Sequence, residues 1–466
     1  MAEHILFLTG RLARPRLEKV LQAIQPADFT YATQEIGKVA GLMTADLIRR
    51  RLSSIEADRV IVPGRCRGDL DALSAQFGTP FMRGPDDLKD LPEFFGRKGG
   101  PPDLSRHDVQ IFAEIVEAPT LDIPGILRRA GEYRAEGADV IDLGCLPETP
   151  FPHLEEAVAA LRENGFRVSV DSADVEELRR GGRAGADYLL SLTEETLWLA
   201  DEVGSVPVLI PAQHGDLDSL VRAMDALDGR GRPYLADPIL DPIHFGFMES
   251  LGRYAALRRR RPEAPILMGT GNLTELTDAD STGVNAVLMG IVSELHITSV
   301  LVVQVSPHCR RAVKETDVAR RIMFAAREEG SLPQRIDPAL LCLRDRKPFP
   351  NTPEEIAEMA AAVPDDSFRI EAGADGVHIY NRRGHHVAGD PFDLFPHLGV
   401  EQDGSHAFYL GVETAKAQVA WQLGKRYVQD QPLGWGCAVD RPAEDLTHHQ
   451  PAGTTLQAKQ KQQREP

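Results

Sequence analysis

Cysteine is scarce in this sequence, with five residues in a chain of 466. They stand far apart, and no two form a CxxC pair. This spacing excludes a disulfide framework and a sequence-local zinc site, and it is typical of a reduced, cytoplasmic protein. No apolar run reaches the roughly 18–20 residues that cross a bilayer. The first residues, Met1 to Leu8, lack the basic stretch of a signal peptide, so we expect none.

Positive charge is also in short supply. The chain has 52 Lys and Arg against 70 Asp and Glu, a formal net charge of −18. Nucleic acid and anionic membranes are therefore not expected as partners. Three histidines (His214, His244 and His308) show no HxH or HExxH spacing, so no dedicated metal site is predicted. The hydrophobic content of 42% allows a large core, and the length indicates more than one domain.

Residues 108–330 contain eight apolar strand patterns, each followed by a helix pattern. The first runs Val109–Val116 and Ile123–Glu136, and the last runs Thr298–Val305 and Arg310–Glu328. Eight such units over about 220 residues fit a (β/α)₈ TIM barrel, which usually has about 250 residues. A doubly wound sheet is the alternative, but the chain shows no crossover region. The fold class predicted is α/β, with the barrel as its centre.

Smaller domains flank the predicted barrel. Residues 1–95 alternate strands and helices, which indicates a parallel α/β domain. Two turns in it carry arginines after a strand, at 10–14 and 64–68, where anions bind in such folds; solvated loop arginines are the competing interpretation. Residues 331–440 read as an α+β domain with a hairpin at 381–384. Residues 441–466 lack periodicity and are predicted to be disordered.

Polar side chains follow the predicted barrel strands, at the end where barrel active sites lie. Strand order gives the candidate binding residues Glu114, Asp142, Asp171, Ser191, Gln213, Asp237, Asn272, Gln304, His308 and Arg310. Most are hydrogen-bonding or acidic, and only the last strand contributes positive charge. A ligand with a polar heteroaromatic head and an anionic tail would suit this ring. Individually, Asp142, Asp171 and Asn272 could instead be helix caps, and Asp237 could belong to an Asp-Pro turn.

Three short motifs carry a resemblance to a known family. Residues 137–144 read GADVIDLG, residues 170–172 read VDS, and Asp237 is followed by Pro238. In this order and spacing they resemble dihydropteroate synthase and the related pterin-binding methyltransferases, over residues 108 to about 310. The small domains before and after the barrel resemble the variants of archaea and methylotrophic bacteria that make tetrahydromethanopterin. Departures from the family pattern include Ser191 in place of an asparagine and Thr270-Gly271-Asn272 without a lysine.

The resemblance implies a transferase of folate or tetrahydromethanopterin biosynthesis. It would join a dihydropterin methyl diphosphate to an arylamine, either p-aminobenzoate or ribofuranosylaminobenzene phosphate, and release diphosphate. Asp171, Asp237 and Asn272 would hold the pterin, while His308, Arg310 and Mg²⁺ would neutralise the diphosphate. The alternatives are methyl transfer from a pterin to a corrinoid protein and pterin binding without catalysis. A homodimer through outer helices is also expected.

Overall fold

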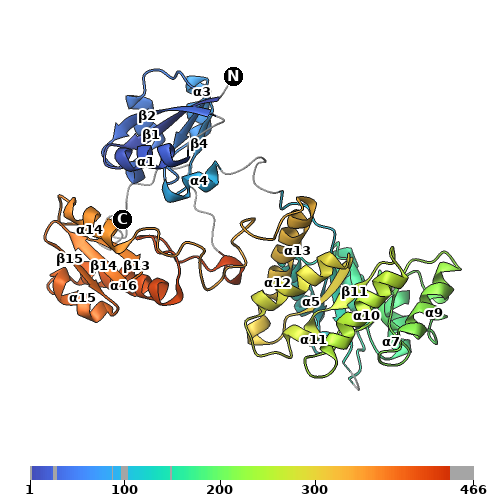
Figure 1. The fold of residues 1–466 in the computed structure, drawn as a ribbon. Helices are drawn as coiled ribbons and strands as arrows, with labels where there is room; N and C mark the ends of the chain where they lie inside the picture. The colour runs from blue at the N-terminus through green and yellow to red at the C-terminus, as the bar shows by residue number, and fades with distance from the viewer. Residues whose placement is uncertain (1–2, 25–28, 87, 96–102, 147–148, 441–466) are drawn as a thin grey trace, which may run out of the picture. The chain divides into compact units, whose positions relative to one another are not determined.

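The computed structural model describes residues 3–24, 29–86, 88–95, 103–146 and 149–440 (Figure 1). The chain divides into two units, which are described separately. One unit holds the described residues of 1–100 and 347–433, and the other holds those of 101–346 and 434–440. The predicted disordered tail, residues 441–466, lies outside the described residues. In the part of the chain that the structure describes, no helix combines the length and apolar character needed to cross a membrane.

The larger unit is a TIM barrel, as predicted. Its strands are all parallel and hydrogen-bonded in the order β10-β9-β8-β7-β6-β5-β12-β11, and a bridge between Ala236 and Ile266 closes the circle. The elements are β5 (Gln110–Ile115), α5 (Ile123–Glu136), β6 (Val140–Gly144), α6 (Leu154–Glu163), β7 (Val168–Asp171), α7 (Val175–Arg183), β8 (Tyr188–Leu192), α8 (Leu199–Glu202), β9 (Val206–Leu209), α9 (Leu217–Asp228), β10 (Leu235–Ala236), α10 (Phe247–Arg260), β11 (Leu267–Gly269), α11 (Gly271–Thr274), α12 (Ser281–Glu294), β12 (Ser299–Val303) and α13 (Ala312–Glu328).

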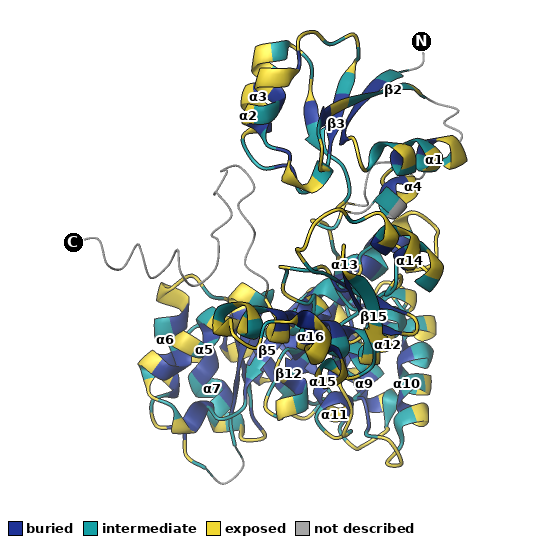
Figure 2. Ribbon diagram, turned by 90° about the vertical axis from the view of Figure 1, so that its left-hand side faces the viewer, coloured by how far each residue is buried: buried dark blue, intermediate teal, exposed yellow. Residues whose placement is uncertain are grey.

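Alternation along each strand separates two apolar layers. In β5, Ile111, Ala113 and Ile115 pack outward against the helices, whereas Phe112 packs inside the barrel. The residues of the interior layer are buried, and Figure 2 colours much of the barrel unit's backbone as buried. Phe112 meets Tyr188 edge to face, with ring centroids 4.9 Å apart. The members of this layer are Phe112, Val140, Tyr188, Leu190, Val208, Leu235 and Leu267. The layer fills the barrel below its mouth, so the polar residues above it have a solid floor.

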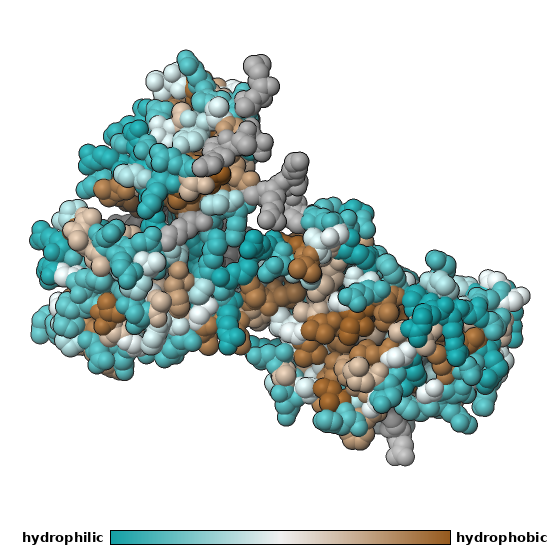
Figure 3. Space-filling view, in the orientation of Figure 1, coloured by the Kyte–Doolittle hydropathy of each residue, from teal (hydrophilic) through white to brown (hydrophobic). Residues whose placement is uncertain are grey.

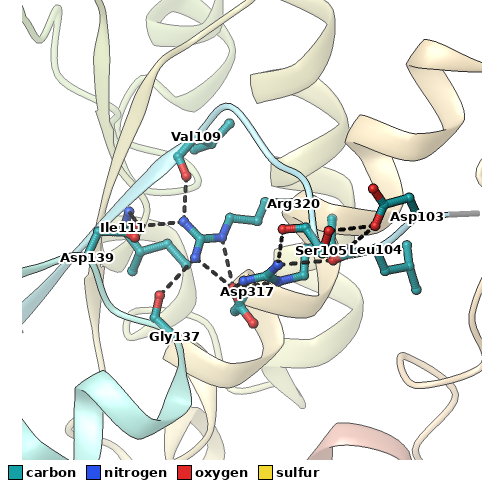
Figure 4. Close-up of polar contacts among 10 residues, drawn as sticks. Asp103, Leu104, Ser105, Val109, Ile111, Gly137, Asp139, Asp317 and Arg320 are labelled. Carbon is teal, nitrogen blue, oxygen red and sulfur yellow. Dashed lines mark hydrogen bonds and ion pairs between the residues drawn. The ribbon is translucent and has the colours of Figure 1, made fainter.

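The opposite, N-terminal end of the barrel is held by Arg320 of α13 (Figure 4). Its guanidinium is buried and ion-paired with Asp139 and Asp317. It also donates to the carbonyls of Val109 and Gly137, at the start of β5 and just after α5. Because charged, buried hydrogen bonds are strong when fully satisfied, this residue ties the last helix to the first βα unit.

The N-terminal domain is a parallel α/β fold, which confirms the prediction. Its sheet has the strand order β2-β1-β3-β4, so the chain reverses direction across the sheet between β1 and β3. Buried aliphatic residues on both sheet faces form its core. The elements are β1 (Glu3–Gly10), α1 (Arg14–Ile24), β2 (Phe29–Gly37), α2 (Ala45–Arg51), β3 (Arg59–Val62), α3 (Leu70–Phe77), β4 (Phe81–Arg83) and α4 (Leu91–Phe94).

The C-terminal domain is an antiparallel three-stranded sheet with helices. The predicted hairpin at 381–384 is confirmed, since Asn381 and Gly384 pair at its end. A capping box between Thr352 and Glu355 begins its first helix. The elements are α14 (Pro353–Ala361), β13 (Arg369–Gly373), β14 (Gly376–Asn381), β15 (Gly384–Ala388), α15 (Pro391–Leu398) and α16 (Gly404–Leu423). The connector 331–346 and the segment 434–440 belong to the barrel unit.

Two barrel elements differ from the sequence pattern. The apolar pattern over Glu195–Val203 predicts a helix after the fourth strand of the barrel, but only the four-residue α8 forms there. The Thr196 hydroxyl bonds to both backbone groups of Thr193 and forms a turn instead. Conversely, the short α11 follows β11 directly and was not predicted. It places Asn272 inside this helix rather than at a helix cap, since the N-cap of α11 is Thr270.

Candidate active site

Three carboxylates come together inside the barrel, at the C-terminal ends of three adjacent strands. Glu114 of β5 lies beside Asp142 of β6 in the strand register, and Gly144 of β6 lies beside Asp171 of β7. All three share the inward side of their strands, above the apolar floor. The strand ends thus converge on one small acidic cluster, as the sequence pattern predicted for Glu114, Asp142 and Asp171.

Asp142 is the most deeply placed member of this cluster. It is fully buried, and its Oδ1 accepts a hydrogen bond from the Ser169 hydroxyl at 2.5 Å. Its Oδ2 has no hydrogen-bond partner among the described residues. Burial, together with the charges of Asp171 and Glu114, raises the pKa of Asp142 well above its usual range. An unpaired buried carboxyl oxygen is costly, so this atom is a natural contact point for a ligand donor.

Glu114 reaches over the end of the neighbouring strand. A Cβ at position 144 would lie 2.5 Å from Glu114 Oε1, so only glycine leaves room for this side chain. Burial raises the pKa of Glu114 to about 7, and the nearby charges of Asp171 and Glu117 act in the same direction. Near neutral pH this carboxyl therefore exists in both protonation states and can either accept or donate a hydrogen bond.

Asp171 is oriented by the next strand. Its Oδ1 accepts a hydrogen bond from the Ser191 hydroxyl at 2.7 Å. Burial raises the pKa of Asp171, and the Ser191 hydrogen bond offsets part of that rise. Ser191 adopts a left-handed backbone conformation, with φ of 67°, which is uncommon for a residue with a Cβ. Such strained positions concentrate at functional sites, where they fix a side chain in place.

Asp237 follows β10 on another side of the barrel. Its Oδ1 accepts hydrogen bonds from the Tyr254 hydroxyl at 2.6 Å and from the Ile239 backbone N–H at 2.8 Å. Burial raises the pKa of Asp237 to about 6, against the effect of these donors. Asp237 is therefore a fixed acceptor with one carboxylate oxygen, Oδ2, outside these hydrogen bonds.

The other predicted residues lie in different surroundings. Asn272 is exposed on α11, and its amide donates to the Leu240 carbonyl at 2.8 Å. Gln213 is exposed after β9, and Arg310 is exposed after β12. His308 Nε2 lies 3.2 Å from the Thr274 carbonyl. These residues are not hydrogen-bonded to the acidic cluster, and no contact of theirs assigns them a role.

Gln304 is engaged away from the cluster. Its amide nitrogen donates to Glu136 of α5 at 3.0 Å, and its amide oxygen accepts from the Val313 backbone of α13. Leu301 of β12 packs with the interior layer, and a Cβ at Gly271 would contact Val303. Side chains alternate along a strand, so Gln304 faces the opposite side from Leu301 and Val303. The structure therefore does not bring Gln304 to the predicted ring. The parity of the strand residues could have indicated this from the sequence.

Sequence reasoning missed three residues that shape the cluster. Ser169 supports Asp142, Gly144 makes room for Glu114, and Tyr254 holds Asp237. Side chains alternate between the two faces of a strand, and Ser169 stands two residues before Asp171 in the strand 168–171. The sequence could therefore have placed both on the same face. Tyr254 lies in the middle of α10, and nothing in its local sequence connects it with Asp237.

A cleft of about 880 Å³ lies beside the ends of β6 and β7, and its lining includes Ser172, the residue after Asp171, but none of the four carboxylates. Among its lining residues, Ser172 donates to Glu177 at 2.6 Å, and Arg180 forms a two-point ion pair with Glu155. Phe151 supplies an apolar wall. The cleft thus combines polar and apolar surface and could accommodate a second, larger molecule next to Asp171.

The described residues contain no group of three or more His, Cys, Asp or Glu side chains arranged to hold a metal ion. None of the four carboxylates forms an ion pair with a Lys or Arg of the described segments. A Mg²⁺ ion is commonly held by one or two carboxylates together with substrate phosphates.

This chain is similar to several known proteins. A family model described as a family of unknown function (DUF6513) matches residues 3–86. An uncharacterized protein of Methanocaldococcus jannaschii is 26% identical over 525 aligned positions, which cover 92% of this chain and 98% of that protein. Among solved structures, the dihydropteroate synthase of Yersinia pestis with a pterine-sulfa conjugate matches at 20% identity and a TM-score of 0.38, covering 49% of this chain and 95% of that one.

Two further solved structures have similar values. The dihydropteroate synthase of Vibrio fischeri matches at 17% identity and a TM-score of 0.38, covering 48% of this chain and 95% of that one. The enzyme of Coxiella burnetii in complex with pteroic acid matches at 16% identity and a TM-score of 0.39, covering 48% and 94%. The TIM barrel itself rests on the strand order and register of this chain.

Proposed function

We propose that the barrel mouth binds a pterin and acts as a dihydropteroate-synthase-like transferase. It would condense a dihydropterin methyl diphosphate with an arylamine, p-aminobenzoate or ribofuranosylaminobenzene phosphate, in folate or tetrahydromethanopterin biosynthesis. The observation that carries the proposal is the set of inward carboxylates, Glu114, Asp142, Asp171 and Asp237, fixed at the C-terminal ends of the strands. The motif resemblance over residues 130–190 also supports it, and its motifs contain two of these carboxylates, Asp142 and Asp171.

The carboxylates match the chemistry of a pterin head. An amino-pyrimidine edge presents adjacent N–H donors, and a carboxylate accepts two such bonds side by side. Asp171 and Asp237 are held by Ser191 and Tyr254, so each is oriented before the ligand arrives. Glu114, with its raised pKa, can supply a proton donor to a ring carbonyl or nitrogen. Asn272 remains a proposed further contact.

The proposed reaction needs little from the protein beyond position. The arylamine nitrogen forms a bond to the methylene carbon of the pterin, the carbon–oxygen bond to diphosphate breaks, and the amine proton leaves to water. The amine is already nucleophilic, so orientation and neutralisation of the leaving group supply most of the rate. The cleft beside Asp171 is the proposed arylamine site. His308 and Arg310 stay proposed as diphosphate contacts, together with Mg²⁺.

A second candidate is methyl transfer from a methylated pterin to a corrinoid protein, or pterin binding without catalysis. The observation that favours it is the lack of an ion-paired Lys or Arg beside the four described carboxylates, where a diphosphate would need compensation. Acidic side chains with raised pKa values, such as Glu114 and Asp142, suit protonation of a reduced pterin nitrogen.

Diphosphate release tests the proposal. Purified protein is incubated with Mg²⁺ and dihydropterin methyl diphosphate, with each arylamine in turn. Release that depends on the arylamine, and that falls in Asp171→Asn but not in the exposed-surface control Glu294→Gln, supports the synthase. Pterin binding without release supports the second candidate. If neither binding nor release occurs, both candidates fail.

A homodimer is part of the same proposal. Hydrophobic side chains gather over α10, α11 and α12 on one face of the barrel unit (Figure 3). Val287 of α12 and Leu276 after α11 are 66% and 67% exposed. We expect the wild-type mass in light scattering to be twice the chain mass, and Val287→Lys to reduce it. A monomeric wild type at all concentrations would contradict the dimer.

A further inference from the structure

Two cysteines that stand far apart in the sequence lie side by side in the barrel unit. Cys342 belongs to the connector 331–346, and Cys437 belongs to the segment 434–440. Their Sγ atoms are 3.9 Å apart, and both residues are free thiols. The sulfurs of a disulfide are about 2.05 Å apart, so this gap would have to close by roughly 1.9 Å. Rotation about the Cα–Cβ bonds of the two cysteines can bring the sulfurs together.

The backbone holds the two thiols near each other. The Cys437 N–H donates to the carbonyl of Ala339, three residues before Cys342, at 2.7 Å. Gly436 has a left-handed conformation, with φ of 52°. A Cβ at this position would clash with the Ala339 carbonyl oxygen and lie 3.3 Å from Cys342 Sγ. Glycine is therefore what lets the segment approach the connector so closely.

Both cysteines are also fixed to the barrel itself. The Arg311 guanidinium, just before α13, donates to the Cys437 carbonyl at 3.3 Å and forms an ion pair with Glu136 of α5. On the other side, Cys342 Sγ lies 3.7 Å from Thr282 Oγ1 of α12. The pair is thus positioned entirely by groups of one unit.

The two thiols differ in the way that thiol–disulfide exchange requires. Cys342 is partly exposed, whereas Cys437 is 5% exposed. The hydrogen bond from Cys437 lowers the pKa of Cys342 to about 6. Donating this hydrogen bond, together with burial, raises the pKa of Cys437. Because the thiolate is the attacking species, Cys342 is suited to react first with an external molecule, and Cys437 is suited to react second.

We propose that Cys342 and Cys437 form a reversible dithiol–disulfide site that reacts with a low-molecular-weight disulfide such as oxidised glutathione. The Cys342 thiolate attacks one sulfur of that molecule, which forms a mixed disulfide and releases the first glutathione thiolate. Cys437 then loses its proton and attacks the Cys342 sulfur, which releases the second. The glutathione thiolates take up the protons that the two cysteines gave up, so the protein loses two electrons and the small disulfide gains them.

The disulfide acts as a clasp on the segment 434–440. The chain leaves the barrel unit after residue 346 and returns to it at residue 434, so residues 347–433 lie between the two cysteines. The cross-link closes this part of the chain into a covalent loop. It also prevents the segment from lifting away from the connector, which is a local opening that the hydrogen bonds alone permit.

Oxidised glutathione is the probe, added to the full chain, with thiols and cross-linked peptides measured by mass spectrometry. The wild type should lose two of its five thiols, form the link between Cys342 and Cys437, and retain no glutathione. Cys437→Ser lacks the second thiol and should retain one glutathione on Cys342. Cys66→Ser, which changes a buried thiol of the N-terminal domain, is the matched control and should form the link as the wild type does.

Hydrogen exchange at the Cys437 N–H measures the clasp, because this group exchanges when its bond to the Ala339 carbonyl opens. Oxidation should slow the exchange by about tenfold in the wild type, and dithiothreitol should restore the original rate. Oxidised glutathione should not slow it in Cys342→Ser. The proposal is overturned if all five thiols survive, if the wild type retains glutathione on Cys342 without forming the link, or if the oxidised and reduced proteins exchange at the same rate.

Discussion

The Ser191 hydroxyl donates a 2.7 Å hydrogen bond to Asp171 from a backbone with φ of 67°. A strained residue on β8 thus orients the carboxylate at the end of β7. Strain of this kind costs on the order of 1–3 kcal/mol and persists where it fixes a functional group. The proposed pterin contact at Asp171 therefore depends on Ser191, whose backbone conformation orients the carboxylate at a cost in folding stability.

Ser191→Gly and Ser191→Ala should separate these two effects. Both remove the hydroxyl, so both should weaken pterin binding. Glycine relieves the left-handed strain and alanine does not, so Ser191→Gly should be more stable than Ser191→Ala by about 1 kcal/mol. Urea denaturation and pterin titration measure the two quantities. Equal free energies of unfolding for the two variants would contradict backbone strain at position 191.

Loss of the Ser191 hydroxyl should also change the pH profile of pterin binding. The hydrogen bond favours the ionised Asp171, so Ser191→Ala should raise the pKa of Asp171 further. The carboxylate needed for binding would then form only at higher pH. The midpoint of affinity against pH should move upward, and a downward move would show that another group controls it.

Glu114 should make stability depend on pH. Its pKa is raised from 4.5 to about 7 on folding, so the folded state holds this proton more tightly than the unfolded chain. Stability from this group is fully present below pH 4.5 and is lost as the pH rises through 7, by about 3 kcal/mol. Glu114→Gln should flatten the profile over this range, and the exposed control Glu294→Gln should not.

Arg320 should be a major source of barrel stability. Removing it takes the Arg320 ion pair away from Asp139 and leaves Asp317 paired with Arg321 alone, and breaking such a buried pair costs on the order of 3–5 kcal/mol. Arg320→Met should therefore lower the free energy of unfolding by that amount. Arg230→Met, which breaks an exposed pair with Asp201, should change it by less than about 1 kcal/mol. Similar losses in both variants would contradict the role of burial.

Cys342 should be the most reactive thiol among the five. Its Sγ lies 3.9 Å from Cys437 Sγ, and the hydrogen bond from Cys437 lowers the pKa of Cys342 to about 6. Burial raises the pKa of Cys66 to about 11 and that of Cys309 to about 12. Iodoacetamide at pH 7 should therefore modify Cys342 first, as mass spectrometry would show. Cys437→Ala should slow this reaction.

Strong local patterns were sufficient for much of the fold. The helix Ile123–Glu136 lies where the sequence predicts it, because the apolar spacing, the Asp122 cap and Gly137 agree there. Weaker patterns failed at residues 195–203, where a Thr196 side chain competes for the backbone. The sequence did not predict α11 either, because its four residues are too few to show a helical period.

The sequence by itself determined that the chain builds a barrel and which strand ends carry acids, because side-chain alternation and the order of elements are local properties. Only the tertiary structure decided that Glu114, Asp142 and Asp171 share one cluster while Gln304 turns to Glu136. It also brought Tyr254 to Asp237, and it left Asp142 Oδ2 without a hydrogen-bond partner among the residues that the structure describes. Those contacts join residues far apart in the chain, and burial then sets their pKa values.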